Sequence, residues 1–379
     1  MDKKNKNPNV PNLRFSSFTD LFRLYTLKDV LQRVSIPVNV EENKLYYQIG
    51  IRSHSKGIFH KEAETGKQIG NKRIFWIEPN CMILNIVFAW EQAVAKTSEK
   101  EVGMVASHRF PMYKVLNNSL DYIVDFFKTE KGKQLLQMAS PGGAGRNKTL
   151  NQDFFLNSKI YLPSLNEQLK TSNLIDLIED RIETQSKIIN DYKILKKHII
   201  KSFIKQNGTS YLLSEIAELG RGRVINSAEI SKQKNPIYPV YSSQTSNNGI
   251  MGYLDNYDYE GEYITWTTDG ANAGTVYYRN GKFNCTNVCG ILKIKNGYDA
   301  YYISNILNCY TKKYVSTNLA NPKLMNNVMA NIKINLPSIE QQKHSSKILQ
   351  SIEYRVEIEE DIKLNLVKQK AFLLKNMFI

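Results

Sequence analysis

The segment SPGGAGRNKT, residues 140–149, contains the residue types of a phosphate-binding loop. Counted from Gly142, Lys148 and Thr149 stand where a Walker-A loop has the lysine that reaches phosphates and the hydroxyl that binds magnesium. However, Asn147 replaces the second obligatory glycine, and the segment follows a predicted helix rather than a strand. We therefore interpret it as a loop that binds no nucleotide, and we predict no cofactor in this chain.

The sequence NPIY, residues 235–238, is similar to the Asn-Pro-Pro-Tyr loop with which adenine methyltransferases hold a flipped base. Ile237 replaces a proline of that loop, and no glycine-rich cofactor loop precedes it on a strand–helix unit. We interpret it as a turn at the edge of a strand. No paired carboxylates, nucleophile triad or metal–carboxylate cluster emerges elsewhere, so we predict no catalytic residue.

The four cysteines could suggest a metal site, because Cys285 and Cys289 are only four positions apart. A zinc site needs two further ligands at compact spacing, and the five histidines are isolated from one another. Too few and too scattered for a disulfide framework, the cysteines are expected to pack as small apolar side chains. We predict no metal.

Charge indicates an anionic partner. The 379 residues contain 51 Lys and Arg against 36 Asp and Glu, which gives a formal charge of +15 and a pI near 9.4. Nucleic acid is the leading candidate and an acidic membrane surface the second. No run of 18 apolar residues exists, and the start MDKKNKNPNVPNLRF lacks the apolar core of a signal peptide. We therefore expect a cytoplasmic protein.

Two segments repeat each other at a constant shift of 174 positions. LPSLNEQLKTSNLIDLIEDRIE begins at Leu162, and LPSIEQQKHSSKILQSIEYRVE begins at Leu336. Apolar residues in both recur at steps of three or four, which predicts one long amphipathic helix each, capped by Ser164 or Ser338. The residues identical at this shift are Leu162, Pro163, Ser164, Gln168, Ser172, Ile178, Glu179, Arg181, Glu183, Ile188, Lys196 and Lys201.

A segment large enough for a domain precedes each repeated helix. Short runs rich in Tyr, Ile and Val, broken by Gly and Asn, predict strands and turns in residues 20–161 and 206–335. A helix is predicted before each repeat, over residues 119–139 and 300–315. We therefore expect an α+β fold with two mostly-β domains, each followed by a long helix, and the two helices packed as an antiparallel coiled coil.

The expected division of the chain is an N-terminal arm (1–19), a first domain (20–161), a first helix (162–205), a second domain (206–335) and a second helix (336–379). Antiparallel packing would bring the C-terminal end near the first domain.

Together, these residues resemble the specificity subunits of type I restriction-modification systems. The resemblance covers essentially the whole chain. It depends on PNLRFSSFTD at the start, on LPSLNEQ and LPSIEQQ entering the helices, and on IEDRIE and IEYRVE within them. Further similarities are GIFHKEAETGK, RIFWIEP and SHRFPMY in the first domain, and GIMGYLDNY and EGEYITWTTDGANAG in the second.

The resemblance implies that each domain is a target recognition domain that reads one half of a bipartite sequence in double-stranded DNA. The helices would form the spacer on which two modification (methyltransferase) subunits dock, and restriction subunits would join to cut DNA. S-adenosylmethionine, ATP and Mg would then belong to the partner subunits. Independently, two different domains held apart by helices suit two half-sites of an asymmetric target.

Basic, hydroxyl and amide side chains in loops are the candidates for DNA contact, since Arg suits guanine edges and Lys suits phosphates. In the first domain these are Arg52, Ser53, Lys56, His60, Lys72, Arg73, His108, Arg109, Arg146, Asn147 and Lys148. In the second domain these are Arg221, Arg223, Ser242, Ser243, Gln244, Asn247, Asn248, Thr268, Asn321 and Lys323. Charges at matched helix positions are the candidates for partner docking: Glu179, Arg181, Glu183, Glu353, Arg355 and Glu357.

Two other functions are weighed against a DNA-reading adaptor. A self-sufficient DNA adenine methyltransferase would bind S-adenosylmethionine without partners. A purely structural coiled-coil adaptor would leave the net charge and the two elaborate domains unexplained.

Overall fold

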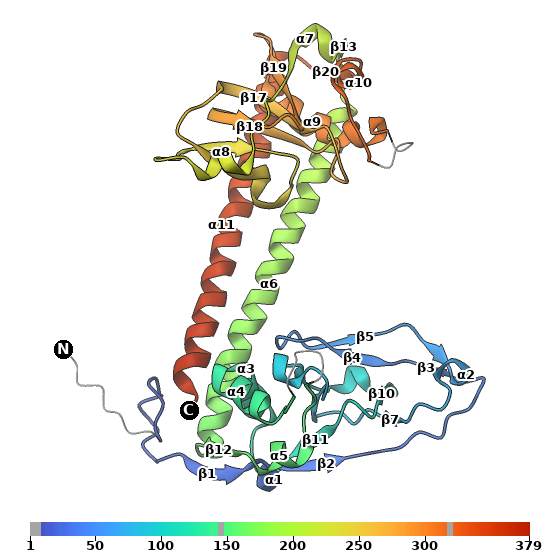
Figure 1. Cartoon of the computed structure of the whole chain (residues 1–379), viewed down its shortest axis with the longest axis vertical. Helices are drawn as coiled ribbons and strands as arrows, with labels where there is room; N and C mark the ends of the chain where they lie inside the picture. Colours follow the sequence, from blue (N-terminus) through green and yellow to red (C-terminus); the bar gives the residue numbers. More distant parts are fainter. Residues whose placement is uncertain (1–8, 143–147, 317–320) are drawn as a thin grey trace, which may run out of the picture. The chain divides into compact units, whose positions relative to one another are not determined.

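The computed structural model describes residues 9–142, 148–316 and 321–379 (Figure 1). Its contacts divide the chain into two compact units, which we call unit 1 (Met1–Ser186 with Ile362–Ile379) and unit 2 (Lys187–Asp361). The two longest helices, α6 (Leu165–Ile204) and α11 (Ile339–Met377), contribute to both units. Among the described residues, no helix is both long and apolar enough to span a membrane.

Unit 1 is built mainly from short strands before α6. Its elements are β1 (Arg23–Thr26), α1 (Leu27–Val30), β2 (Leu31–Val34), β3 (Leu45–Tyr46), β4 (Ile49–Ile51), β5 (Ile58–His60), β6 (Glu64–Thr65), α2 (Gly66–Ile69), β7 (Ile74–Trp76), β8 (Met82–Leu84), η1 (Ala89–Glu91), β9 (Val94–Lys96), η2 (Glu99–Glu101), β10 (Val105–Ser107), β11 (Met112–Val115), α3 (Leu120–Lys128), α4 (Glu130–Met138), α5 (Gln152–Asn157) and β12 (Lys159–Leu162).

Unit 2 has longer strands. Its elements are β13 (Thr209–Leu212), α7 (Leu213–Ile216), β14 (Ala217–Arg221), α8 (Ser227–Ser231), β15 (Tyr238–Tyr241), η4 (Ser246–Gly249), β16 (Ile250–Leu254), β17 (Tyr259–Thr267), β18 (Val276–Cys285), β19 (Cys289–Ile294), α9 (Ala300–Tyr310), η5 (Thr311–Tyr314), α10 (Asn326–Ala330) and β20 (Lys333–Leu336).

The main sheets of the two units share one topology. Unit 1 has the strand order β2-β11-β8-β9, and four strands of unit 2 have the order β14-β19-β17-β18. In chain order both read first, fourth, second, third, and all of these neighbouring pairs are antiparallel. Unit 2 extends its sheet beyond β18 with β15 and β16, whereas unit 1 places β3–β7 and β10 in small separate sheets. The repeat therefore extends from the helices to the domain cores, where the sequence shows little trace of it.

Both units also enter their sheets in the same way. β1 pairs with β12, and β13 pairs with β20, so each domain's first strand is joined to the strand that leads into its long helix. A single helical turn follows each first strand, α1 or α7. A carboxylate caps each turn: Asp29 accepts from the Thr26 N–H at 3.1 Å, and Glu215 from the Leu212 N–H at 2.7 Å.

The single helix predicted over residues 119–139 is wrong in one respect. Thr129 has extended backbone angles (φ −78°, ψ 165°) and separates α3 from α4. Its hydroxyl accepts from the Gly132 N–H at 3.1 Å and so caps α4. Threonine is one of the residues preferred at this position before a helix. The helix predicted over 300–315 is α9 as far as Tyr310 and then tightens into the 3₁₀ turn η5.

The strand predictions fit more closely. NPIY leads directly into β15, and Asp255 holds it by accepting the N–H groups of Lys234 and Asn235 at 3.0 and 2.8 Å. The expectation that all cysteines pack inside holds for Cys81, Cys285 and Cys289 but is wrong for Cys309, which is exposed on α9.

A glutamine that the repeat preserves attaches each long helix to the helix before it. Gln168 Nε2 donates to the Pro163 C=O at 2.9 Å, and its Oε1 accepts from the N–H of Ser119, the N-cap of α3, at 3.0 Å. Gln342 makes the equivalent bonds to Pro337 (2.9 Å) and to Asp299, the N-cap of α9 (3.1 Å). Both glutamines are buried. The repeated Pro-Ser-x-x-x-Gln pattern is therefore an anchor for a domain as well as a helix start.

The long helices pack antiparallel, and the expected fold class is confirmed. In unit 1 Lys370 Nζ lies 2.6 Å from Glu179 Oε1, and in unit 2 Lys193 Nζ lies 2.6 Å from Glu360 Oε1. Ser338 caps α11 by accepting from the Gln341 N–H at 3.3 Å. The domain cores also take up further residues of the long helices: Ile175 and its counterpart Leu349 are fully buried and pack into these cores.

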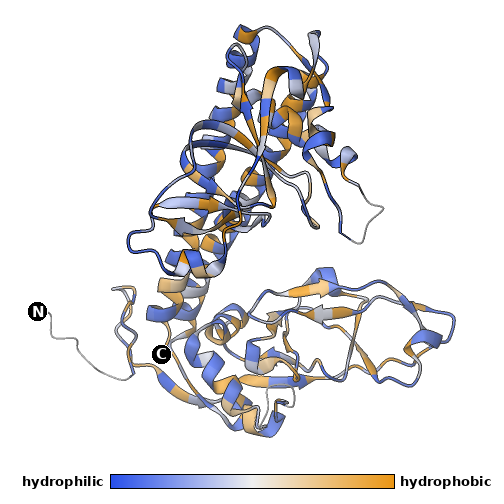
Figure 2. Ribbon diagram, turned by 45° about the horizontal axis from the view of Figure 1, so that its top comes forward, coloured by the Kyte–Doolittle hydropathy of each residue, from blue (hydrophilic) through white to orange (hydrophobic). Residues whose placement is uncertain are grey.

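The C-terminal end of the chain is part of the unit 1 core. Phe378 stacks on Tyr122 with ring centroids 4.7 Å apart, and Leu373 and Met377 belong to the same cluster. The N-terminal arm is fastened nearby, because Arg14 makes two bonds of 2.7 Å to Glu167. The predicted return of the C-terminus to the first domain is therefore confirmed. Hydrophobic residues recur along the strands and the long helices of both units (Figure 2).

Candidate nucleic-acid interface

Three predicted DNA-binding residues of unit 2 meet at one carboxylate, that of Asp269. Arg221 Nη2 lies 3.1 Å from Asp269 Oδ2, and Lys323 Nζ lies 3.5 Å from Oδ1. Thr268 Oγ1 donates to Oδ2 at 2.6 Å, and Asn321 stands two positions before Lys323. Asp269 was not among the residues predicted from the sequence, although its place in the segment TTDG is a cue. One carboxylate fixes two cations here and leaves the cluster with net positive charge.

Arg223 has a different environment. Its Nη2 lies 2.6 Å from Glu229 Oε1, and its Nε lies 3.0 Å from Asp258 Oδ2. The hydrogen bond from Arg223 holds the pKa of Glu229 below its usual value. Two carboxylates therefore neutralise this guanidinium, and it adds little net charge to the surface.

The remaining predicted residues of unit 2 lie in one exposed loop between β15 and β16. The Ser242 N–H donates to the Gly249 C=O at 2.9 Å and closes the loop. Asn247 and Asn248 are exposed and have left-handed backbone angles, with φ of 48° and 52°. The loop thus brings together Ser242, Ser243, Gln244, Asn247 and Asn248.

In unit 1 the loop after β4 and the segment before β9 form a second group. Ser53 Oγ donates to Glu91 Oε2 at 2.9 Å, and the Lys148 ammonium lies 5.2 Å from the centre of the neighbouring Trp90 ring. Arg52 lies over Phe59, 4.8 Å from its ring centre. Aromatic rings of this kind hold the long basic side chains of Arg52 and Lys148 in place.

The other predicted residues of unit 1 lie at several places. His60 Nε2 lies 3.0 Å from Glu101 Oε1; although burial alone would raise the pKa of Glu101, bonds from His60 and Ser98 hold it below its usual value. The His108 N–H donates to the Arg73 C=O at 3.2 Å, which places Lys72, Arg73, His108 and Arg109 near the β7–β10 pair. Lys56 lines a cavity described below. Arg146 and Asn147, in the middle of the Walker-like segment, lie outside the described residues.

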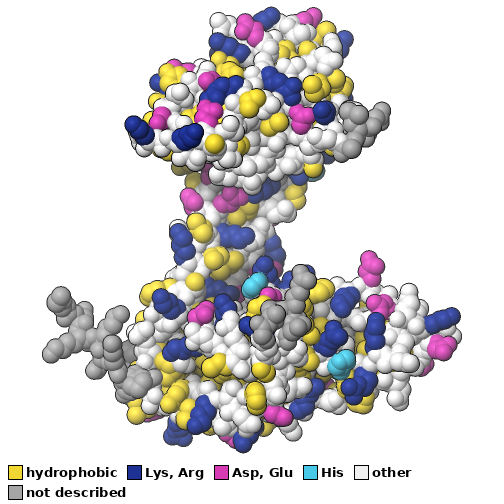
Figure 3. Space-filling view, viewed as in Figure 1, with side chains coloured by type: hydrophobic (Ala, Val, Ile, Leu, Met, Phe, Trp, Pro, Cys, Tyr) yellow, Lys and Arg dark blue, Asp and Glu magenta, His cyan; other side chains and the backbone are white. Residues whose placement is uncertain are grey.

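Lys and Arg side chains are spread over both units and are interspersed with Asp and Glu (Figure 3). On the face shown, the basic residues are therefore dispersed, and local ion pairing decides which of them are available.

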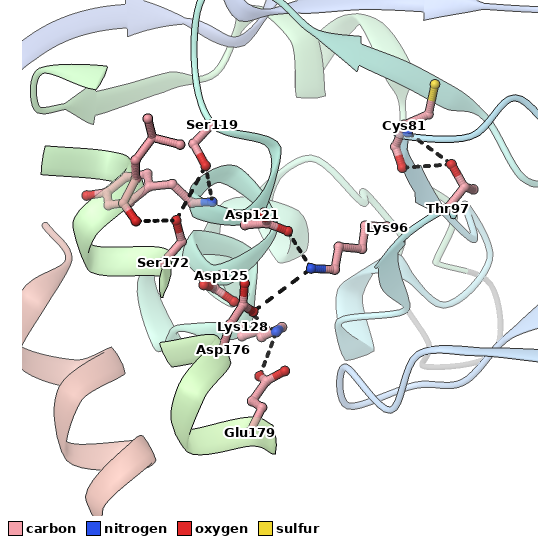
Figure 4. A network of polar contacts seen from close by, with 12 residues as sticks. Cys81, Lys96, Thr97, Ser119, Asp121, Asp125, Lys128, Ser172, Asp176 and Glu179 are labelled. Atoms are coloured by element: carbon pink, nitrogen blue, oxygen red, sulfur yellow. Dashed lines mark hydrogen bonds and ion pairs between the residues drawn. The ribbon is translucent and has the colours of Figure 1, made fainter. Parts of the chain in front are cut away.

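Each long helix contributes a glutamate to a cavity between the helix and its domain. In unit 1 the cavity is about 330 Å³ and is lined by Lys96, Asp121, Asp125, Lys128 and Glu179 among others (Figure 4). Lys128 Nζ lies 2.8 Å from both Asp125 and Glu179. Asp125 Oδ2 has no hydrogen-bond partner among the residues that the structure describes, and burial raises the pKa of Asp125 to about 6 despite Lys128.

The equivalent cavity in unit 2 is about 540 Å³ and has a different chemistry. Glu353, the counterpart of Glu179, accepts from Lys196 and Tyr301. Lys196 is the counterpart of Lys370, which pairs with Glu179 in unit 1. Residues at equivalent positions of the repeat therefore form the cross-helix ion pair in both units. Asn305 occupies the place of Asp125, six residues after the N-cap of its helix.

The predicted docking residues are placed as follows. Glu179 and Glu353 make the cross-helix ion pairs, and Glu357 lines the unit 2 cavity. Arg181 lines a groove of about 670 Å³ between α6 and α11 in unit 1. Arg355, whose side chain is 53% exposed, pairs with the buried Glu359 at 2.5 Å. Glu183 has a contact within the chain.

Comparison with known proteins identifies the family and the fold of the chain. Residues 207–369 match the family model described as the type I restriction modification DNA specificity domain. The chain is 43% identical over 142 residues to the N-terminus of a type I specificity subunit from Mycoplasma pneumoniae, covering 37% of this chain and 75% of the relative. A second type I specificity subunit of that organism is 36% identical over 199 residues, covering 51% of this chain and 82% of the relative.

The specificity subunit of the type I restriction enzyme MpnII, also from M. pneumoniae, is 42% identical over 146 residues, but the match covers only 38% of this chain and 43% of that subunit. Among solved structures, the S subunit of a type I restriction-modification system from M. genitalium superposes with a TM-score of 0.64 at 14% identity, covering 98% of this chain and 99% of the other. A structure from a study of type I complex assembly gives a TM-score of 0.61 at 14% identity, covering 94% and 97%. These structures share the fold.

Proposed function

The chain belongs to the DNA specificity subunits of type I restriction-modification systems, and we propose that it reads a bipartite, asymmetric DNA target with one half-site for each domain. The observation that supports this most is the shared sheet topology with different loops. The two domains repeat the same four-strand order and the same glutamine anchor, yet their insertions differ. Different loops on equivalent scaffolds suit two different half-sites.

The long helices act as the ruler between the half-sites in this proposal. A helix rises about 1.5 Å per residue, so four added residues lengthen it by about 6 Å, close to two base pairs at 3.4 Å each. We would insert four residues after Asp191 together with four after its counterpart Asn365. The methylated sequence in a host that carries the partner subunits should keep its bases and gain about two base pairs of spacer.

The control is the same insertion after Asn296, in an exposed turn of unit 2 outside both helices. It should leave the spacer unchanged. If the helix variant methylated a target with altered bases and the same spacer length, the helices would not set the spacing between the half-sites.

The helices also dock two methyltransferase subunits in this proposal, and restriction subunits join that complex. Arg181 and Arg355 are the principal candidates, because both side chains are exposed at matched positions, whereas Glu179 and Glu353 are half-buried in cross-helix ion pairs. The double change Arg181→Glu and Arg355→Glu should lower the number of bound methyltransferase subunits in native mass spectrometry. Lys347→Glu, an exposed α11 charge without a matched partner on α6, is the control. Assembly with two partners in the double variant would exclude these arginines from docking.

Catalysis and its cofactors, S-adenosylmethionine, ATP and Mg, are assigned to the partner subunits, and the complex is placed in the cytoplasm. Calorimetry of the isolated chain with S-adenosylmethionine tests this assignment. Binding with a one-to-one stoichiometry would favour a self-sufficient methyltransferase.

A further inference from the structure

Arg279, on β18 of unit 2, is a buried cation in an unusual setting. Its side chain is 3% exposed, and its guanidinium lies between two tyrosine rings, 3.5 Å from the centre of Tyr241 and 4.4 Å from that of Tyr277. Its Nε donates to Thr265 Oγ1 at 3.2 Å. Within the described parts of the chain, no carboxylate forms an ion pair with it. Burying a cation without an anionic partner is costly, so the position calls for a function that outweighs this cost.

The guanidinium contacts both ends of the exposed loop between β15 and β16. Tyr241, on which it stacks, is the residue directly before the loop. Its Nη2 donates to the C=O of Asn248 at 2.9 Å, at the far end of the loop. A Cβ at the next residue, Gly249, would stand only 3.1 Å from Nη2, so the guanidinium and the loop backbone fit closely.

The backbone that it holds is one that the chain does not adopt readily. Asn247, Asn248 and Gly249 have φ of 48°, 52° and 82°; asparagine enters the left-handed region more readily than other non-glycine residues, but it does so mainly as a single residue. Two asparagines in succession in this region persist only when surrounding contacts fix them. The Arg279 bond to the Asn248 C=O is such a contact, and it sets the direction in which both amide side chains leave the surface.

We propose that Arg279 is a positioning residue for sequence recognition by unit 2: it touches no base, but it holds Asn247 and Asn248 in the conformation that reads the DNA. The effect on DNA recognition rests on the proposed function, whereas the anchoring of the loop by Arg279 does not. A planar guanidinium suits the place because it can stack on two rings and donate along its edge at the same time.

The anchoring is tested first on the full chain without DNA. Arg279→Gln should speed amide hydrogen exchange in peptides spanning residues 242–250 by about tenfold or more, the factor expected for loss of a hydrogen bond to a charged group. Arg279→Lys keeps a cation but loses the planar stack, so it should give an intermediate increase. Unchanged exchange in the loop in both variants would overturn the proposal, whatever the protein binds.

The consequence is tested in the complex with its methyltransferase subunits, on duplexes that differ from the methylated target by one base. Arg279→Gln should reduce discrimination at the half-site read by unit 2 by about tenfold, and leave discrimination at the other half-site unchanged. Lys295→Gln is the matched control, because it removes a cation that donates to a backbone C=O, that of Glu215, elsewhere in the same domain.

The outcomes separate the two proposals. If the wild-type complex shows no bipartite target, the proposed function fails, while the hydrogen-exchange result still decides the anchoring. Equal loss at both half-sites, or loss in Lys295→Gln as well, would mean a general structural role and would overturn the positioning proposal. If Arg279→Gln does not fold, Arg279→Lys carries the same comparison, and unaltered discrimination in it overturns the proposal.

Discussion

The two units use the same four-strand sheet for different surfaces. In unit 1 the chain leaves the sheet between β2 and β8 to form small two-stranded pieces, and its exposed loop after β4 lies against η1. In unit 2 the corresponding insertion extends the sheet by β15 and β16, and a buried arginine fixes its loop. What remains equal in both is the part that meets the long helices. The two units thus share the part that contacts the long helices and differ in their insertions.

The same comparison holds at the level of single side chains. The glutamine anchor and the cross-helix ion pair keep their residues in both units, whereas the cavity beside the pair differs: Asp125 and Lys128 line it in unit 1, and tyrosines and asparagines join the charged side chains that line it in unit 2. The shared features thus predict equal effects of mutation, and the differing cavity predicts unequal ones.

The largest effect is expected at the glutamine anchors. Gln168→Ala and Gln342→Ala should each lower the free energy of unfolding by about 2–4 kcal/mol, because each leaves a buried N–H and C=O unpaired and opens a void. Urea unfolding measures the loss, and hydrogen exchange assigns it to a unit. Gln350→Ala, at an exposed site of α11, should stay within about 0.5 kcal/mol. A large loss at only one anchor would break the equivalence of the two units.

A pH effect is expected in unit 1 from Asp125. Its folded-state pKa of about 6 lies above the ordinary 3.8, so between these pH values the folded protein binds a proton at Asp125 that the unfolded chain has lost. The resulting stabilisation is fully present below about pH 4 and is lost as the pH rises through about 6, a change of about 2–3 kcal/mol. Asp125→Asn removes this dependence and should make unit 1 more stable than wild type at pH 8, as measured by urea unfolding across the pH range.

Unit 2 supplies the reciprocal experiment, since Asn305 stands at the equivalent position. Asn305→Asp should introduce a pH dependence of the same sign there. If Asp125→Asn left the pH profile of unit 1 unaltered, the Asp125 carboxyl would be ionised, with Lys128 offsetting the free energy of burying its charge. The two cavities would then not differ in the pH dependence of stability.

The smallest effect is expected at the repeated glutamates. Glu179→Gln removes the negative charge beside two partly buried lysines, Lys128 and Lys370, whereas Glu353→Gln removes it beside one lysine and a neutral tyrosine. We expect a loss of about 1–2 kcal/mol in unit 1 and about half as much in unit 2. Thermal unfolding at low and high salt measures both, and a larger loss in unit 2 would contradict the charge-based reasoning.

Sequence patterns predicted the helices well because their physical cause is local. The apolar period and the Leu-Pro-Ser entry lie within each segment, so α6 and α11 were predicted to within a few residues. Prediction was less complete where partners are distant. The burial of Ile175 and Leu349, and the role of Gln168, depend on a domain that packs against the helix from elsewhere in the chain.

The candidate site shows the same limit. Arg221, Thr268 and Lys323 were chosen from the sequence for their chemical types, but their common partner Asp269 appears only when three separate segments meet. Arg279 was not chosen at all, because a lone arginine in a strand of tyrosines has no distinguishing pattern in sequence.

The sequence by itself determined the duplication, the two amphipathic helices, the positive charge and the family resemblance, since each of these is written in residue types and in their spacing along the chain. Only the tertiary structure decided that the duplication includes both sheets. It also decided which basic side chains are held in place by carbonyl groups, carboxylates or aromatic rings, and which loop backbone is fixed in a left-handed conformation. The physical reason is that strand order and ion pairing join residues far apart in the chain, and many different sequences can satisfy the same strand order.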